Sequence, residues 1–149
     1  MSNENITIRQ YKEDDKDYAT NLMRHLCNTF HVEFDEERWK RALDEKILKS
    51  DLTRLFLAEI KDEIVGMLVA DIRRGGSSTR TGYITNLIVA PDSRNIGAGE
   101  SLMKHAIDFL RENHAQAVKV NVRATVPDAR RLFTKLGFKE YVIQYFKPL

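Results

Sequence analysis

Residues 81–114 read TGYITNLIVAPDSRNIGAGESLMKHAIDFLRENH, which contains a strand, a tight loop and a helix in succession. The first part is apolar and β-branched, so it predicts a buried strand, and Pro91 ends it because proline has no N–H to donate to a sheet. The apolar positions of this strand are Ile84, Leu87, Ile88 and Val89. Beyond the loop, apolar residues recur at helical spacing and predict a helix with one face on a core. This stripe consists of Leu102, Met103, Ala106, Ile107 and Leu110.

The loop between strand and helix has the features of an anion site. A helix start leaves its first backbone N–H groups without partners and carries partial positive charge. Gly97 and Gly99 have no Cβ atom, so a ligand can approach the backbone closely. Arg94 adds a cation whose donors suit phosphate. Because open α/β sheets bind ligands at the carboxyl ends of their strands, the loop predicts a site for a phosphate-bearing cofactor.

The glycine spacing excludes two common phosphate-binding motifs. The chain contains no G-x-x-x-x-G-K-S/T run, so it has no P-loop. A dinucleotide fingerprint needs a third glycine at the position of Leu102 and a strand that ends directly before the first glycine. Neither condition is met here.

The loop instead resembles motif A of the Gcn5-related N-acetyltransferases (the GNAT superfamily), written Gln/Arg-x-x-Gly-x-Gly/Ala. Here the motif is Arg94-x-x-Gly97-x-Gly99. The C-terminal part is also similar to the family's motif B, Asn-x-x-Ala-x-x-Leu/Phe-Tyr-x-x-x-Gly-Phe. The residues in register with motif B are Ala129, Leu132, Gly137 and Phe138.

The order of predicted elements extends the resemblance over nearly the whole chain. Hydrophobic periodicity, caps and turn residues predict the order β-α-α-β-β-β-α-β-α-β. The expected ranges are a strand at 6–10, helices at 14–30 and from 35, strands at 54–60, 64–72 and 83–90, the helix after the glycine loop, a strand at 117–124, a helix from 127 to Gly137, and a strand at 138–146. The strand at 117–124 should lie parallel to the central strand. The resemblance implies the GNAT acyl-CoA N-acyltransferase fold, an α+β (α/β) domain with a mixed sheet of about six to seven strands and about four helices.

Composition fits one cytoplasmic domain over residues 1–149. The chain has 24 Lys and Arg against 22 Asp and Glu, a balance that argues against a nucleic-acid partner. The single Cys27, expected in the core, excludes an internal disulfide and suits a reducing compartment. No signal peptide or run of 18 apolar residues is present, so no membrane partner is expected. His25 and His31 have no second ligand at metal spacing, and no metal site is expected.

The resemblance implies acetyl-CoA as co-substrate and assigns its binding residues. Backbone groups of the central strand would pair with the pantetheine arm, and the glycine loop would hold the pyrophosphate. The strand positions are Leu87, Ile88 and Val89. The loop positions are Arg94, Asn95, Ile96, Gly97, Ala98, Gly99 and Glu100, the last through its backbone N–H.

The sequence departs from the family pattern at three positions that concern catalysis. Phe133 stands where many members have a tyrosine that protonates the leaving thiolate. Val126 stands at the Asn that opens motif B, and Asn121 stands where some relatives carry a glutamate base. Asparagine can orient a water molecule but cannot accept a proton at neutral pH.

Three accounts of the acid–base chemistry stay open. The acid could be Tyr141 or Tyr145, with a water held by Asn121 or Asn86 taking the proton of the amine. Alternatively, the enzyme could depend on positioning alone, which supplies about 7–11 kcal/mol in favourable cases. In the third account the protein binds acyl-CoA without efficient turnover.

These inferences predict an acetyl-CoA-dependent N-acetyltransferase that acts on a primary amine of a small molecule or peptide by direct attack. Backbone N–H groups of the central strand would hold the charge that develops on the carbonyl oxygen. The alternative is a non-catalytic acyl-CoA binding or regulatory module, and a third idea is another phosphate-bearing cofactor in the same loop. The sequence does not identify the amine, and it leaves open a homodimer through the aromatic C-terminal strand.

Overall fold

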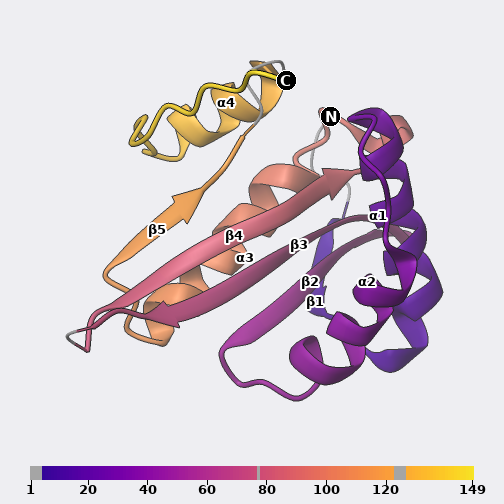
Figure 1. The fold of residues 1–149 in the computed structure, drawn as a ribbon. Coiled ribbons are helices and arrows are strands. Elements are labelled where there is room, and N and C mark those ends of the chain that lie inside the picture. The colour runs from indigo at the N-terminus through magenta and orange to yellow at the C-terminus, as the bar shows by residue number, and fades with distance from the viewer. Residues whose placement is uncertain (1–4, 77, 123–126) are drawn as a thin grey trace.

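The computed structural model describes residues 5–76, 78–122 and 127–149. In these residues a five-stranded sheet is flanked by four α-helices (Figure 1). The strands are β1 (Thr7–Gln10), β2 (Thr53–Ile60), β3 (Glu63–Arg74), β4 (Arg80–Val89) and β5 (Ala117–Val120). The helices are α1 (Lys16–Thr29), α2 (Glu36–Ala42), α3 (Ala98–Glu112) and α4 (Pro127–Lys135). Short helical turns are η1 (Glu13–Asp15), η2 (Leu43–Ile47) and η3 (Pro91–Ser93).

The sheet is mixed, as predicted. Its strands lie in the order β1-β2-β3-β4-β5. Neighbouring strands are antiparallel except β4 and β5, which are parallel. A parallel pair needs a crossover connection, and α3 provides it from behind the sheet (Figure 1). The predicted pairing of the central strand with the strand that begins at Ala117 is therefore confirmed.

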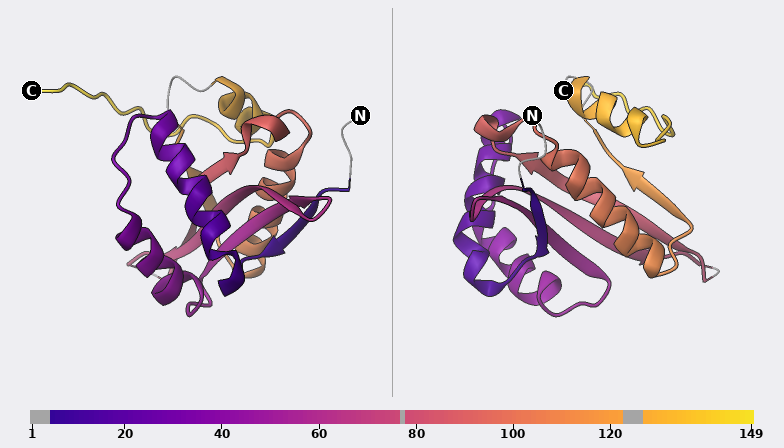
Figure 2. Two further views of the ribbon diagram at one scale, coloured as in Figure 1. Left: turned by 90° about the vertical axis from the view of Figure 1, so that its right-hand side faces the viewer. Right: turned by 180° about the vertical axis from the view of Figure 1, so that it is seen from behind.

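The sheet separates two hydrophobic cores. α1 and α2 cover one face and α3 covers the other (Figure 2). Within β2, Leu55 and Leu57 belong to the core under α1 and α2, whereas Phe56 and Ala58 pack on the α3 side. This alternation follows from the period of two of a β-strand. α4 lies past the carboxyl end of β5 and joins the α3 core through the buried Phe133.

The last predicted strand, at residues 138–146, is wrong. Residues 138–149 form no strand, and Tyr141 and Tyr145 are 78% and 91% exposed. Aromatic and β-branched residues favour a strand, but backbone N–H and C=O groups must also find a neighbouring edge. This segment pairs with no strand among the described residues, so the sheet has five strands instead of six or seven.

Other boundaries shift by a few residues. β3 extends to Arg74 and β4 begins at Arg80, so their hairpin loop is shorter than the gap between the predicted strands at 64–72 and 83–90. The strand predicted at 117–124 ends at Val120, and residues 123–126 lie outside the described part of the chain. The stop at Gly137 is confirmed by its φ of +92° directly after α4. None of the helices in the described residues is long and apolar enough to cross a bilayer.

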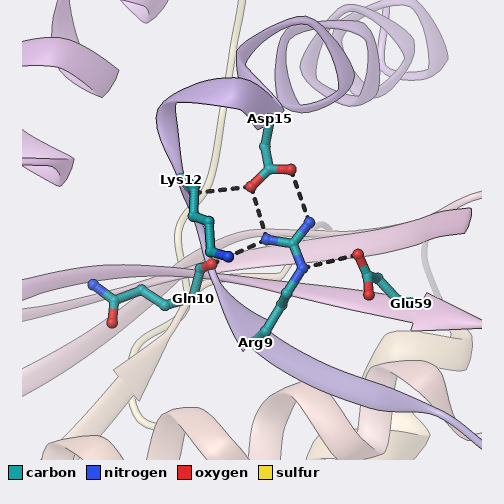
Figure 3. A network of polar contacts seen from close by, with 5 residues as sticks. All are labelled: Arg9, Gln10, Lys12, Asp15 and Glu59. Atoms are coloured by element: carbon teal, nitrogen blue, oxygen red, sulfur yellow. Dashed lines mark hydrogen bonds and ion pairs between the residues drawn. The ribbon is translucent and has the colours of Figure 1, made fainter. Parts of the chain in front are cut away.

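A buried ion-pair network fastens β1 to β2 and to the start of α1 (Figure 3). The carboxylate of Asp15, a residue only 6% exposed, accepts hydrogen bonds from Nη1 and Nη2 of Arg9, both at 2.8 Å. It also accepts from the backbone N–H of Lys12 at 2.8 Å, while Arg9 Nε donates to Glu59 at 2.8 Å. The Arg9 hydrogen bonds, chiefly, lower the pKa of Asp15 from its ordinary value of 3.8.

Replacing Asp15 with Asn should destabilise the fold in a pH-dependent way. Breaking a fully buried pair costs about 3–5 kcal/mol, and we expect about 2–3 kcal/mol here because Arg9 retains some solvent contact. Since the folded-state pKa of Asp15 is lowered, its stabilisation is present above pH 3.8 and is lost as the pH falls through the folded pKa. Urea unfolding at several pH values should therefore show the two proteins converging in acid. A difference that stays constant would contradict this role, and the exposed Asp108→Asn is the control.

Candidate functional site

A β-bulge at Asn86 interrupts β4. Met67 of β3 lies opposite Ile88, and Val69 lies opposite Thr85, so β4 uses one residue more than β3 over this interval. Asn86 has a φ of +55°, in the left-handed region that asparagine adopts more readily than most residues. A bulge of this kind disrupts the ladder locally and bends the strand.

The bulge reverses the faces that β4 presents. Ile84 and Ile88 are four residues apart and would share one face of a regular strand. Instead, Ile84 lies in the α3 core and Ile88 lies in the core under α1 and α2. The extra residue thus lets β4 contribute apolar side chains to both cores.

β5 pairs along its whole length, but only with the first half of β4. The pairs run from Thr81 with Ala117 to Ile84 with Val120. Past Ile84 the pairing stops, because β5 ends at Val120 while β4 continues to Val89. Backbone groups of residues 85–89 therefore have no β5 partner in the described part of the chain.

The predicted pantetheine-binding residues lie on this free edge. The side chains of Leu87 and Val89 pack against the α3 core, and Ile88 is buried in the opposite core. Their side chains are thus used for packing. Pairing of their backbone groups with the pantetheine arm, which the resemblance implies, stays a prediction.

The glycine loop leads directly from the end of β4 into α3. Arg94 is exposed, and its Nε donates to the carbonyl oxygen of Val89 at 3.4 Å, which joins the loop to the strand end. Asn95 and Gly97 have φ values of +66° and +93°. A Cβ atom on Gly97 would have only Ile6 Cδ1 near it, at 3.8 Å, so side chains of the described residues do not fill the space beside this backbone.

The first turn of α3 presents unpaired amide groups beside this space. Gly97 is the N-cap and Ala98 the first helical residue, so the N–H groups of residues 98–100 have no helical acceptor. The Glu100 carboxylate accepts from Lys135 Nζ at 2.8 Å and pairs with Lys104 at 3.0 Å. These two contacts, with Lys135 the larger, lower the pKa of Glu100. The carboxylate therefore stays ionised and is held toward α4 and the flank of α3.

This geometry fits a diphosphate group. The loop offers the Arg94 cation, the positive end of α3 and open space beside Gly97. No acidic side chain occurs between Arg94 and Gly99. An extended arm attached to the diphosphate could continue along the free edge of β4.

The two predicted catalytic residues lie near the C-terminal end of β5. Asn121 directly follows this strand and is exposed. Tyr141 is also exposed, and Lys119 Nζ lies 5.1 Å from the centroid of its ring, which places the ring beside β5. Their roles stay predictions.

Phe133, at the family's tyrosine position, is a core residue in this chain. It is 6% exposed, and its ring centroid lies 5.8 Å from that of Phe138. The position therefore contributes packing and offers no proton donor. Val126, the other departure in motif B, lies outside the described residues.

A cavity of about 450 Å³ lies on the sheet face that α1 and α2 cover. Its walls come from α1, α2, η2, the connection between α1 and α2, and strands β2 to β4. Thr85 and Asn86 are its β4 residues, so the cavity meets the strand at the bulge. Its apolar wall includes Met23, Phe34, Trp39, Ile47 and Val69. Cys27 also lines it and is half-buried, so the expected core position for this residue is wrong.

A charged cluster occupies part of this cavity. Asp71 Oδ1 accepts from Thr53 Oγ1 at 2.8 Å, and Oδ2 accepts from Arg73 Nε at 3.1 Å. Lys46 Nζ lies 3.6 Å from the same Oδ2 atom. The sequence did not predict the cluster, because Thr53 and Lys46 are distant in sequence from Asp71 and because Arg73 lies beyond the predicted strand at 64–72. The spacing of Asp71 and Arg73, two residues apart at the end of an apolar strand, was the available signal.

Comparison with known proteins gives a consistent result. The model of the Acetyltransferase (GNAT) family matches residues 16–138. An N-alpha-acetyltransferase from Sulfurisphaera tokodaii is 30% identical over 101 residues, which cover 62% of this chain and 60% of that protein. An uncharacterized N-acetyltransferase from Methanocaldococcus jannaschii is 25% identical over 137 residues, which cover 90% of this chain and 61% of that protein. The chain thus spans about three fifths of the length of these two relatives.

Solved structures include acetyltransferases with a similar fold. A predicted acetyltransferase with acetyl-CoA from Clostridium acetobutylicum matches with a TM-score of 0.80 at 16% identity, covering 96% of both chains. The family match includes β4, the glycine loop and α3, whose geometry suits a diphosphate with an extended arm. This chain therefore belongs to the Acetyltransferase (GNAT) family.

Proposed function

We propose that this protein is an acyltransferase that moves an acetyl group from acetyl-CoA to a primary amine of a small molecule or a peptide. One observation carries the proposal: the glycine loop opens beside the unpaired edge of the strand that it follows. A diphosphate and its extended arm therefore have adjacent places to bind. The cavity meets the same part of β4 on the sheet face that α1 and α2 cover. The amine substrate would enter through this cavity.

The loop and the strand edge have distinct roles in binding. The amide groups at the start of α3, together with Arg94, would hold the diphosphate. Backbone groups of Leu87, Ile88 and Val89 would pair with the pantetheine arm, like an added strand. Bound acetyl-CoA supplies an acetyl group activated as a thioester, and its transfer forms a C–N bond, breaks a C–S bond and releases CoA as the thiol.

The cavity residues would position the amine and remove its proton. Asn86 lines the cavity at the bulge, and its side-chain amide can orient a water molecule toward the amine. Asn121 is the second candidate for this role, from the outer side of β5. Holding amine and thioester together can lower the barrier by about 7–11 kcal/mol. Tyr141 is our candidate for the acid that protonates the leaving thiolate.

Acyl-CoA binding without turnover is the second candidate function. The buried Phe133 favours it, because the usual acid position then has no hydroxyl group. Both functions need the loop and the strand edge. They differ only in whether an amine becomes acetylated.

Calorimetry and thiol release together test the two functions. We expect acetyl-CoA to bind with a Kd below about 1 mM, equivalent to about −4 kcal/mol or better. We also expect thiol release with at least one member of a panel of amines, polyamines, amino acids and peptides. Binding without release from any of them would favour the non-catalytic module. Absence of binding, or equal competition by NAD or ATP, would remove the acetyl-CoA assignment.

Gly99→Asp should weaken acetyl-CoA binding strongly, whereas Gly99→Ala should retain it. A Cβ atom on Gly99 would meet Leu132 Cδ2 at 3.4 Å and Val89 Cγ2 at 3.8 Å, which are ordinary contacts. A carboxylate there would place a negative charge in the first turn of α3, whose N–H groups would hold the phosphates, and like charges a few ångströms apart repel by about 1–4 kcal/mol. We therefore expect Kd to increase at least about tenfold for Asp and less than about threefold for Ala. Equal Kd values for both variants, with unchanged thermal unfolding, would contradict the proposed phosphate site.

We also propose that two copies associate through their C-terminal segments. In residues 139–149 the apolar side chains are exposed, and Phe146 is 87% exposed. β5 is an edge strand of the described sheet, so its backbone can accept a strand from a second copy. Light scattering should give twice the mass of one chain, and Tyr145→Asp with Phe146→Asp should give a single chain. A monomeric wild-type protein at about 100 μM would contradict the dimer, since a standard interface binds more tightly than that.

A further inference from the structure

We propose that the cavity contains an anion subsite, formed by Arg73 and Lys46, that selects peptide acceptors with an acidic side chain close to their N-terminus. This inference rests on the proposed function and adds a substrate class to it. It depends on how Arg73 is held, on the local charge, and on the distance from the cluster to the bulge.

Arg73 is fixed on two sides while one end of its guanidinium group stays free. Its Nε donates to Asp71 Oδ2 at 3.1 Å, and its guanidinium carbon lies 3.9 Å from the centroid of the Tyr83 ring. Asp71 is itself buried and held by Thr53 Oγ1 at 2.8 Å. No hydrogen bond among the described residues uses Nη1 or Nη2 of Arg73. A preoriented guanidinium fork of this kind matches a carboxylate with two parallel hydrogen bonds.

The cluster has an excess of positive charge. Lys46 Nζ lies 3.6 Å from the Asp71 carboxylate that Arg73 already contacts, so two cations face one anion. Both cationic side chains are more than half exposed and line the cavity, so a ligand can reach them. The other charged residues of the cavity wall are Glu33, Asp35 and Arg38, and Asp35 accepts a hydrogen bond from the backbone of α2. The cavity wall as a whole therefore has equal numbers of cations and anions, and the local positive excess lies at Arg73 and Lys46.

The distance from the bulge to Arg73 selects peptides over single amino acids. Val69 lies opposite Thr85, next to the bulge, and Arg73 follows four residues later along β3. β3 runs from there toward the hairpin with β4 (Figure 1), and the guanidinium group of Arg73 lies back against Asp71 and the Tyr83 ring, which pair two residues beyond Val69 and Thr85. At about 3.3 Å per residue the guanidinium group is about 7–10 Å from the bulge. An extended peptide spans this distance in about two or three residues beyond the one that carries the amine. With its amine at the bulge, a peptide would bring the side chain of its third or fourth residue to Arg73, whereas the carboxylate of a free α-amino acid lies too close to its amine.

A peptide panel with matched variants tests the subsite. Hexapeptides identical except for Glu, Gln or Lys at positions 3 and 4 are compared by acetylation rate and by binding to the full chain. We expect kcat/KM for the Glu peptide to exceed that for the Lys peptide about tenfold, the effect of one charged hydrogen bond. Arg73→Gln should remove this preference and leave the Gln peptide within about twofold of wild type. Arg111→Gln, which alters an exposed pair on α3, is the control and should keep the preference.

The outcomes separate this inference from the proposed function. Acetylation of all peptides with no acidic preference, or of small amines alone, overturns the subsite while the transferase stands. Without any turnover, the transferase fails, and the binding measurement still decides the subsite: tighter binding of the Glu peptide that Arg73→Gln removes supports it, and equal binding overturns it. Thermal unfolding of Arg73→Gln together with Arg73→Lys, which keeps the charge, excludes a general loss of fold.

Discussion

One extra residue in the middle of β4 determines how the two halves of the site meet. The bulge at Asn86 lets Ile84 and Ile88 enter opposite cores, so both layers of helices pack firmly on one central strand. It also coincides with the point where β4 stops pairing with β5. The free edge, the glycine loop and the cavity can therefore converge on a few residues of β4.

Positive charge gathers at two separate ends of the site. At the loop, the start of α3 and Arg94 attract an anion, and Glu100 does not oppose them because Lys104 and Lys135 pair with its carboxylate. At the far end of the cavity, two cations share the single carboxylate of Asp71. Both groups of cations are accessible to a ligand, because Lys46, Arg73 and Arg94 are exposed.

The acid–base part of the site differs from the usual family pattern for a packing reason. Phe133 fills the α3 core and contacts Phe138, so this position contributes to stability and has no hydroxyl group to donate a proton. The polar residues that we propose for the reaction are instead Asn86, which lines the cavity at the bulge, and those beside β5. Catalysis in such a site would depend mainly on holding the two reactants in place.

The sequence alone determined the family, the mixed sheet and the location of the loop, because periodicity, caps and glycine spacing are local properties that residues 81–114 express directly. It could not place the C-terminal segment, since strand propensity says nothing about whether a partner edge is available. Nor could it reveal the bulge, which only the register between β3 and β4 defines. The sequence also could not predict the cluster of Arg73, Asp71 and Lys46. Charges that are distant in sequence become one site only when strands and helices bring them within a few ångströms of each other.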